Sequence, residues 1–205
     1  MLGPALGKQL KQRFSRDDKA DSAPPLPRVF FNDEISAERG FVYATLPLAD
    51  IKRVKDAFGV TVNDVILALV SSTLRDYLLA YETLPAASLR AAMAVSLRDD
   101  DDDSLSNKVT STPVSLATDR ADPLVRLQAI SAASDKAKQA VRGGGVGIVE
   151  VLQSLPPLLV HTMTQTLGPE QTPAMMGANV VVSNVRGSPK PMYIAGARLE
   201  CMYPI

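Results

Sequence analysis

Residues 60–78 are the stretch that most constrains the fold of this chain. Apolar side chains fill most positions after Asn63 and Asp64, which predicts one long helix with an apolar face so wide that little of the helix remains for water. Thr61 is a suitable N-cap, and Asp64 completes a capping box three residues later. We therefore expect this helix to be the central element of a domain. The residues expected at the centre of its inward face are Val62, Val65, Ile66, Leu69, Thr73 and Tyr77, and Leu67, Val70, Leu74 and Leu78 are expected to widen that face.

Composition excludes several classes of protein. The chain has 205 residues, of which 46% are hydrophobic, so it can bury a sizeable core. Lys and Arg together number 22, as do Asp and Glu, and there is no Trp, so neither a basic field nor a stacking surface indicates nucleic-acid binding. The single cysteine, Cys201, excludes an intramolecular disulfide and a thiolate metal cluster. The acidic run 99–103 lacks the spaced ligands of a cation loop and is predicted to be a solvated loop, so no metal is expected.

The first 28 residues are predicted to lie outside the domain. Residues 1–16 form a basic amphipathic pattern, which fits either a helix on an anionic membrane surface or a connector helix packed on the domain. Residues 17–28 are proline-rich and read as an extended linker, so the domain is predicted to cover residues 29–205. No signal peptide is visible, and no segment reaches the roughly 18 apolar residues of a membrane span. We expect a cytoplasmic protein, soluble or peripheral on the inner membrane face or on lipid inclusions.

The remaining pattern predicts an α+β fold. Helices are expected over 48–58, ended by Gly59, and over 123–141, capped by Asp122. In the second helix, Leu124 and Leu127 are expected to point inward and Arg126 outward. Strands are expected over 39–46, 89–98, 109–116 and 192–200, with Pro113 marking an edge or a bulge. Residues 179–189 are expected to form a β-branched strand that runs into a turn. Because strands and helices alternate irregularly, we expect a mixed β-sheet backed by helices in a two-layer sandwich.

His161 is the only histidine. No acidic partner lies near it in the sequence, and we interpret it as structural rather than catalytic. The glycines at 143–145 read as a flexible joint rather than a phosphate-binding loop, since no strand precedes them and no Lys-Ser/Thr pair follows.

Several motifs together resemble a known family. These are Thr61-Val62-Asn63-Asp64-Val65-Ile66-Leu67-Ala68, Val95-Ser96-Leu97-Arg98 before Asn107, Asp122-Pro123 with Arg126-Leu127, and Ser183-Asn184-Val185 followed by Tyr193-Ile194-Ala195-Gly196-Ala197. In this order they resemble the C-terminal half of the bacterial wax ester synthase/diacylglycerol acyltransferases, which belong to the CoA-dependent acyltransferases. The resemblance implies one half of a fold like that of chloramphenicol acetyltransferase.

The resemblance also implies a reaction and its partners. An acyl group would pass from acyl-CoA, a substrate rather than a bound cofactor, to diacylglycerol or a long-chain alcohol. The family's general base is a histidine in an HHxxxDG motif, which is absent here, so no catalytic residue is assigned. We expect the chain to be a fragment or shortened homologue that needs an HHxxxDG half as partner and is inactive alone.

Site residues follow from the same resemblance. Asn63 and Asp64 match the family's Asn-Asp motif and are expected to shape the active-site channel. Arg98, Asn107, Ser183 and Asn184 are expected to contact substrate, although an asparagine that merely forms a turn would give the same pattern. Two departures from the family occur nearby, Ser106 in place of glycine and Arg186 in place of proline.

A second class of function stays open. The same cleft could hold acyl chains or a partner protein without chemistry, as a non-catalytic lipid- or protein-binding module. In either case, a half without its partner would expose an apolar face, so we expect homo-oligomers.

Overall fold

The computed structural model describes residues 25–33, 36–81, 83–96, 109–143, 156–158, 161–162, 177–188 and 190–203. Its elements are a 3-10 helix η2 (Phe30–Asn32), the helices α2 (Leu48–Phe58), α3 (Val62–Ala80) and α4 (Pro123–Arg142), and the strands β1 (Arg90–Ser96), β2 (Val109–Ser115), β3 (Val180–Val182), β4 (Tyr193–Ile194) and β5 (Ala197–Arg198). The predictions for residues 1–16, the acidic run 99–103, Arg98 and Asn107 lie outside the described residues.

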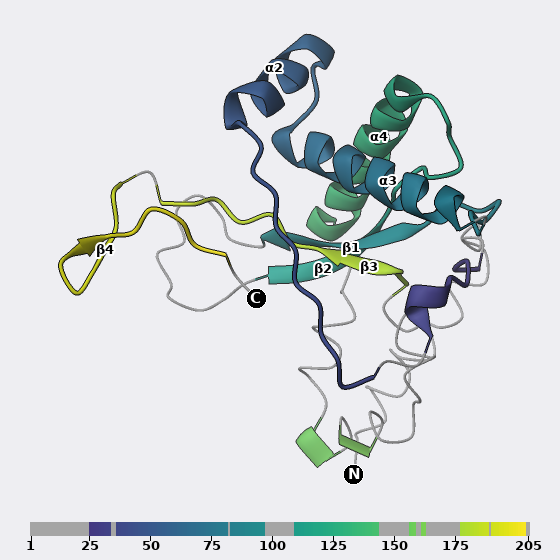
Figure 1. The fold of residues 1–205 in the computed structure, drawn as a ribbon. Coiled ribbons are helices and arrows are strands. Elements are labelled where there is room, and N and C mark those ends of the chain that lie inside the picture. Colours follow the sequence, from purple (N-terminus) through teal and green to yellow (C-terminus); the bar gives the residue numbers. More distant parts are fainter. Residues whose placement is uncertain are drawn as a thin grey trace.

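The described part of the chain forms two layers, as expected for an α+β fold. One layer is a mixed sheet in the order β2-β1-β3, in which β1 pairs antiparallel with β2 and parallel with β3. Figure 1 shows α3 and α4 covering one face of this sheet, and α2 packs on α3. Among the described strands β2 lies at the edge of the sheet, as predicted from Pro113.

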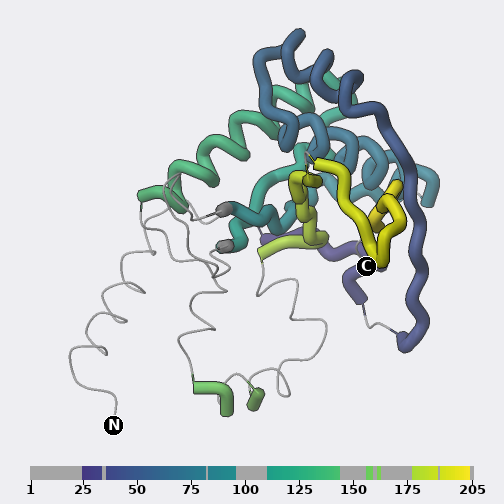
Figure 2. The backbone as a smooth tube through the Cα atoms, turned by 90° about the vertical axis from the view of Figure 1, so that its left-hand side faces the viewer, coloured from purple at the N-terminus to yellow at the C-terminus, as the bar shows by residue number. Residues whose placement is uncertain are grey.

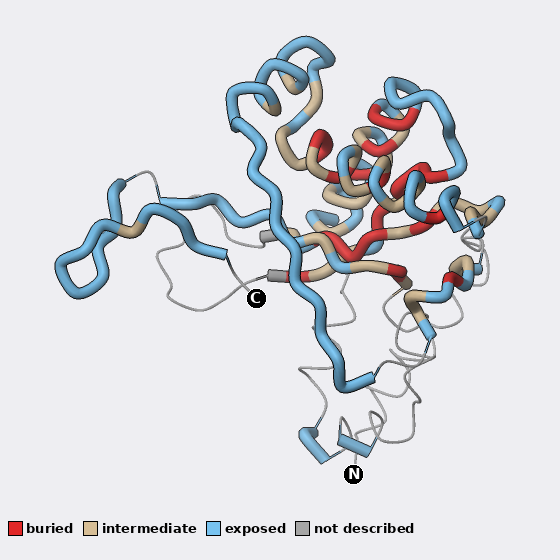
Figure 3. The backbone as a smooth tube through the Cα atoms, viewed as in Figure 1, coloured by how far each residue is buried: buried red, intermediate tan, exposed pale blue. Residues whose placement is uncertain are grey.

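The core lies between the helices and the sheet, where the red segments of Figure 3 gather. Leu67 and Leu78 of α3 and Ile130 of α4 are fully buried against β1 and β2. The residues of the core cluster are Val29, Leu67, Leu78, Leu89, Ala91, Met93, Val114, Leu116, Ala117 and Ile130.

Helix α3 buries only part of the face that was predicted to turn inward. The capping box is present: Thr61 Oγ1 accepts from the Asp64 amide, and Asp64 Oδ2 accepts from the Thr61 amide. The buried residues, however, are Asp64, Val65, Leu67, Ser71 and Leu78, whereas Leu69, Thr73 and Tyr77 are exposed. Val65, Leu67 and Leu78 are thus buried as predicted, whereas the stripe of Leu69, Thr73 and Tyr77 was wrongly placed inward and Ser71 was not expected there. Ser71 can be buried since its hydroxyl donates to the Leu116 carbonyl.

Helix α4 also differs from the prediction near its start. Asp122 caps it, accepting from the amides of Leu124 and Val125, as expected. Leu127 is buried as predicted, but Leu124 is exposed and Arg126 is only 5% exposed, so those two predicted directions are wrong. Arg126 can be buried because its guanidinium donates to the carbonyls of Arg120 and Ala121.

Two predicted strands have a different structure. Residues 36–46 form no strand and are exposed throughout. In Figures 1 and 2 this segment runs up to α2 as extended chain, and no described strand pairs with it, so it is not itself a strand. The stretch 192–200 contains a short hairpin, β4 and β5, rather than one strand. Positive φ values at Ala195 and Gly196, 49° and 84°, form the tight turn that reverses the chain.

Residues 25–33 are attached to the sheet by side chains. Asn179, which precedes β3, donates to the Pro27 carbonyl and to Asn32 Oδ1, and its own carbonyl accepts from Asn32 Nδ2. Its Oδ1 accepts from the Arg90 amide at the start of β1. A buried asparagine thus joins η2, β1 and β3 at one end of the sheet.

Among the described residues, no single helix is long and apolar enough to cross a membrane. Helices α2 and α3 reach that length and composition only as a pair, and the chain bends by 104° between them.

Candidate functional site

The first turn of α3 brings the two residues of the Asn-Asp pair to different surroundings. Asp64 is 0% exposed and faces α4, whereas the neighbouring Asn63 is half-buried and faces β1. The capping box fixes where the helix begins, and so fixes which of the two points inward.

Asp64 is held from two elements. Its Oδ2 accepts from the Thr61 amide at 2.9 Å and from Ser131 Oγ of α4 at 3.2 Å. Within the described part of the chain, Oδ1 is buried without a hydrogen-bond partner. The carboxylate therefore links α3 to α4 through Oδ2, while Oδ1 makes no hydrogen bond to the described residues.

Asn63 is held by residues that are distant in the sequence. Its Nδ2 donates to Sδ of Met93 in β1 at 3.0 Å, and its Oδ1 accepts from Nδ2 of Asn184 at 3.5 Å. Asn184 is exposed and follows β3, so it approaches Asn63 from the chain that leaves the sheet. The structure thus brings together two of the predicted site residues that are 121 positions apart.

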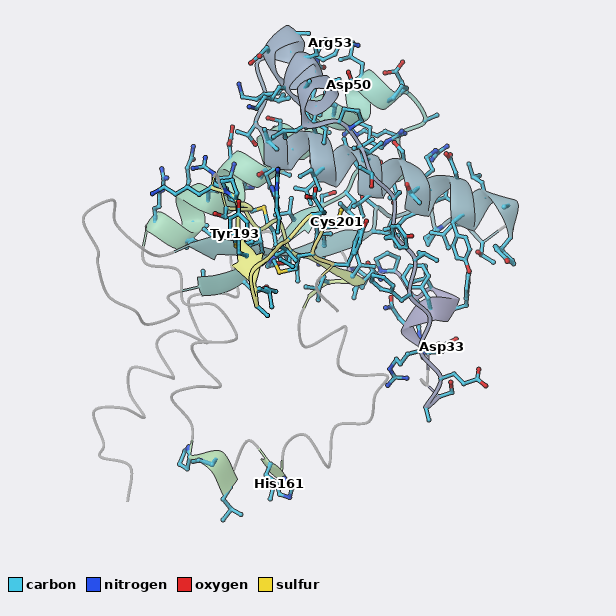
Figure 4. All side chains as sticks on the ribbon, turned by 60° about the vertical axis from the view of Figure 1, so that its left-hand side comes forward. Asp33, Asp50, Arg53, His161, Tyr193 and Cys201 are labelled. Atoms are coloured by element: carbon cyan, nitrogen blue, oxygen red, sulfur yellow. The ribbon has the colours of Figure 1, made fainter. Side chains whose placement is uncertain are left out.

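The other predicted residues are less informative. Ser183 is exposed beside Asn184. The only histidine, His161, is exposed, and Figure 4 shows it well apart from α2, α3 and α4 and from Tyr193. No group of three or more His, Cys, Asp or Glu side chains that could hold a metal ion is found among the described residues. Whether the named residues contact substrate stays a prediction.

Sequence reasoning missed three residues that support the pair: Met93, Ser131 and Ser134. Ser134 is fully buried, and its hydroxyl lies 3.9 Å from the same Met93 sulfur. A signal was present in α4, because Ser131 and Ser134 are spaced by one turn on its inner side, where small hydroxyls can contact a facing helix or strand. Nothing in the pattern of β1 distinguishes Met93 from an ordinary core residue.

Arg126 was also missed as an internal link. Its Nη2 donates to Ser72 Oγ of α3 at 2.8 Å, in addition to its two bonds to the loop before α4. It ties that loop to the middle of α3.

Comparison with known proteins gives matches along most of the chain. The sequence model of the wax ester synthase/diacylglycerol acyltransferase catalytic domain matches residues 4–66, and that of the WS/DGAT C-terminal domain matches residues 105–205. Asn63 and Asp64 therefore lie in the region that matches the catalytic domain, and Asn184 lies in the other. The Asn63–Asn184 contact joins the two matched regions.

Individual proteins agree with this assignment. O-acyltransferase WSD of Acinetobacter baylyi is 31% identical over 185 residues, covering 87% of this chain and 38% of the relative. A probable diacylglycerol O-acyltransferase, tgs2, of Mycobacterium tuberculosis is 36% identical over 189 residues, covering 87% of this chain and 39% of the relative. The chain thus spans well under half the length of these relatives.

A solved structure matches the fold itself. The wax ester synthase/diacylglycerol acyltransferase from Marinobacter aquaeolei VT8 superposes with a TM-score of 0.64 at 29% identity, and the match covers 97% of this chain and 43% of that one. Sequence and fold therefore agree that this chain belongs to the wax ester synthase/diacylglycerol acyltransferase family.

Proposed function

We propose that this chain forms one wall of the reaction site of an O-acyltransferase that moves a fatty acyl group from acyl-CoA to diacylglycerol or to a long-chain alcohol. The observation that carries the proposal is the contact between Asn63 and Asn184, because it joins the regions that match the catalytic and the C-terminal domains of the family. A site formed by both matched regions is suited to a reaction in which acyl-CoA and the acceptor alcohol must meet.

In the proposed reaction, a histidine of an HHxxxDG segment takes the proton from the acceptor hydroxyl. The hydroxyl oxygen then attacks the thioester carbonyl, the C–S bond breaks, and the proton passes to the departing CoA thiolate. Asn63 and Asn184 would orient a substrate beside that histidine, and Asp64 would hold the first turn of α3 in place. The HHxxxDG segment would come from sequence outside this chain, which alone would be inactive.

The test combines this chain with an HHxxxDG-bearing segment of a relative by co-expression. Labelled palmitoyl-CoA is supplied with dioleoylglycerol or hexadecanol, and triacylglycerol and wax ester are measured. We expect product with the unaltered chain and a loss of at least about tenfold in Asn63→Ala, the range of effects for a lost substrate contact. Gln128→Ala, an exposed change on α4, is the matched control and should keep full activity. No product from folded, associated partners would reject the proposal.

A non-catalytic binding module is the second candidate, favoured by the exposed apolar side chains of residues 36–46 and 190–203, among them Phe41, Tyr43 and Tyr203. It predicts that the chain binds fatty acyl chains or lipid vesicles, and that no partner segment restores acyl transfer. A peripheral position on the inner membrane face or on lipid inclusions fits either candidate, and cell fractionation with an antibody to this chain tests it.

A further inference from the structure

The carboxamide of Asn63 has two chemically different ends, and each has its own neighbour. Nδ2, a donor, lies 3.0 Å from Sδ of Met93, while Oδ1, an acceptor, lies 3.5 Å from Nδ2 of Asn184. Met93 is 3% exposed and belongs to the core cluster, whereas Asn184 is exposed. One end of the amide therefore faces the protein interior and the other faces the surface.

Met93 determines which end faces inward. A thioether sulfur carries lone pairs and no hydrogen, so it can only accept. With Nδ2 toward the sulfur the two groups form a hydrogen bond, whereas a flipped amide would place two acceptors against each other. The hydroxyl of Ser134, 3.9 Å from Sδ, also approaches as a donor. The sulfur is thus the acceptor for donors on both α3 and α4.

The sheet register fixes Met93 and Asn184 together. Met93 pairs with Val182 of β3 on one side and with Thr112 of β2 on the other. Asn184 follows Val182 by two residues, so the pairing that places the sulfur beneath Asn63 also delivers Asn184 to its outer end. A shift of β3 by one residue would turn every side chain of the strand to the other face.

We propose that Met93 is a positioning residue that holds the Asn63 amide with Oδ1 outward, so that Asn63 Oδ1 and Asn184 Nδ2 present an acceptor beside a donor. Such a pair fits a group that is itself both donor and acceptor. In an acyltransferase, on which this assignment of the ligand rests, two substrates carry one: the hydroxyl of the acceptor alcohol and the secondary amides of the CoA arm. The weak 3.5 Å contact between the two asparagines is the one that such a group would replace.

The orientation is tested without any activity measurement. In the ¹⁵N-labelled full chain, the side-chain NH₂ signals of Asn63 are assigned by their loss in Asn63→Ser. Met93→Leu preserves volume and removes the acceptor, so we expect these signals to shift, with thermal unfolding little changed. The matched control is Leu89→Met, an equally conservative change at a 0% exposed core position near β1, which should leave the Asn63 signals in place. If the chemical shifts of the Asn63 NH₂ group are the same in Met93→Leu as in the unaltered chain, the proposal is wrong. If that variant does not fold, Met93→Ile gives the same readout.

The ligand is tested in the co-expressed enzyme. We expect Met93→Leu to raise one KM by roughly three- to tenfold, the effect of about one hydrogen bond, and to change kcat less. A rise confined to the alcohol assigns the site to the hydroxyl, and a rise confined to acyl-CoA assigns it to the amide. Unchanged KM values for both substrates overturn the ligand assignment. If even the unaltered chain yields no product while the NMR signals respond to Met93→Leu, the acyltransferase proposal fails and the positioning role stands.

Discussion

At the scale of single residues, burial in this chain follows hydrogen-bond partners more than polarity. Asp64 and Ser71 of α3 are 0% exposed, while Leu69 and Tyr77 on the same helix are 42% and 44% exposed. Each of these two buried polar residues has a partner outside α3, Ser131 for Asp64 and Leu116 for Ser71. Since an unpaired buried polar group costs about 1–3 kcal/mol, these contacts decide which face of α3 turns inward.

Replacing Asp64 tests this at the start of α3. Asp64→Ala leaves the Thr61 amide and the Ser131 hydroxyl without their acceptor, and we expect it to lower the free energy of unfolding by about 2 kcal/mol. Asp76→Ala, at an exposed position of the same helix, should change it by less than about 0.5 kcal/mol. Urea denaturation followed by circular dichroism gives both values, and equal midpoints for the two variants would contradict the argument.

Arg126 offers a second test, because it is a buried cation whose bonds run to neutral groups. Arg126→Ala removes its links to the Arg120 and Ala121 carbonyls and to Ser72, together with the packing of its stem. We expect a loss of about 2 kcal/mol in the free energy of unfolding. The control, Arg120→Ala, keeps that carbonyl and removes an exposed side chain, so a comparable loss there would show that the buried guanidinium contributes little.

At the scale of elements, the helices could be predicted and the isolated extended segments could not. The ends of the helices could be predicted because they depend on local residues: Thr61 and Asp122 are N-caps, and Gly59 ends α2 in a left-handed conformation. A strand depends on a neighbour, so the alternation of residues 39–46 predicted a strand for which the structure supplies no pairing. The Ala-Gly turn at residues 195–196 was missed because alanine is not a usual left-handed residue.

The bend between α2 and α3 depends on Gly59, whose φ of 66° lies in the left-handed region. A Cβ there would meet nothing within 4 Å, so Gly59→Ala changes backbone strain alone. We expect it to lower the free energy of unfolding by about 1 kcal/mol. Gly187→Ala is the matched control, with equal space and no positive φ, and should be neutral or slightly stabilising in the same urea titration. A neutral Gly59→Ala would mean that α2 is loosely attached to α3.

At the scale of the whole molecule, the candidate site is a product of sheet topology. Asn63 and Asp64 could be selected from their motif, but the approach of Asn184 depends on β3 pairing in parallel with β1, and 121 residues separate the two asparagines. No local pattern specifies that register. The role of Met93 could not be predicted for the same reason, because its contact with Asn63 of α3 forms only when the helix packs on the sheet.

Residues 36–46 and 190–203 together expose an apolar surface. Phe41, Val42 and Tyr43 are 52%, 92% and 67% exposed, and the Tyr43 ring lies 4.6 Å from that of Tyr203. Exposed apolar side chains gathered in this way favour association, so we expect the chain alone to form oligomers.

Sedimentation velocity measures this association directly. Because Val42 and Ile194 are 92% and 65% exposed, Val42→Ser combined with Ile194→Ser should shift the distribution toward monomer without lowering stability. Leu158→Ser, at a position 73% exposed in another part of the chain, should leave the distribution unchanged. If the unaltered chain sediments as a single monomeric species, the exposed surface does not drive association. If all three proteins behave alike as oligomers, another surface does.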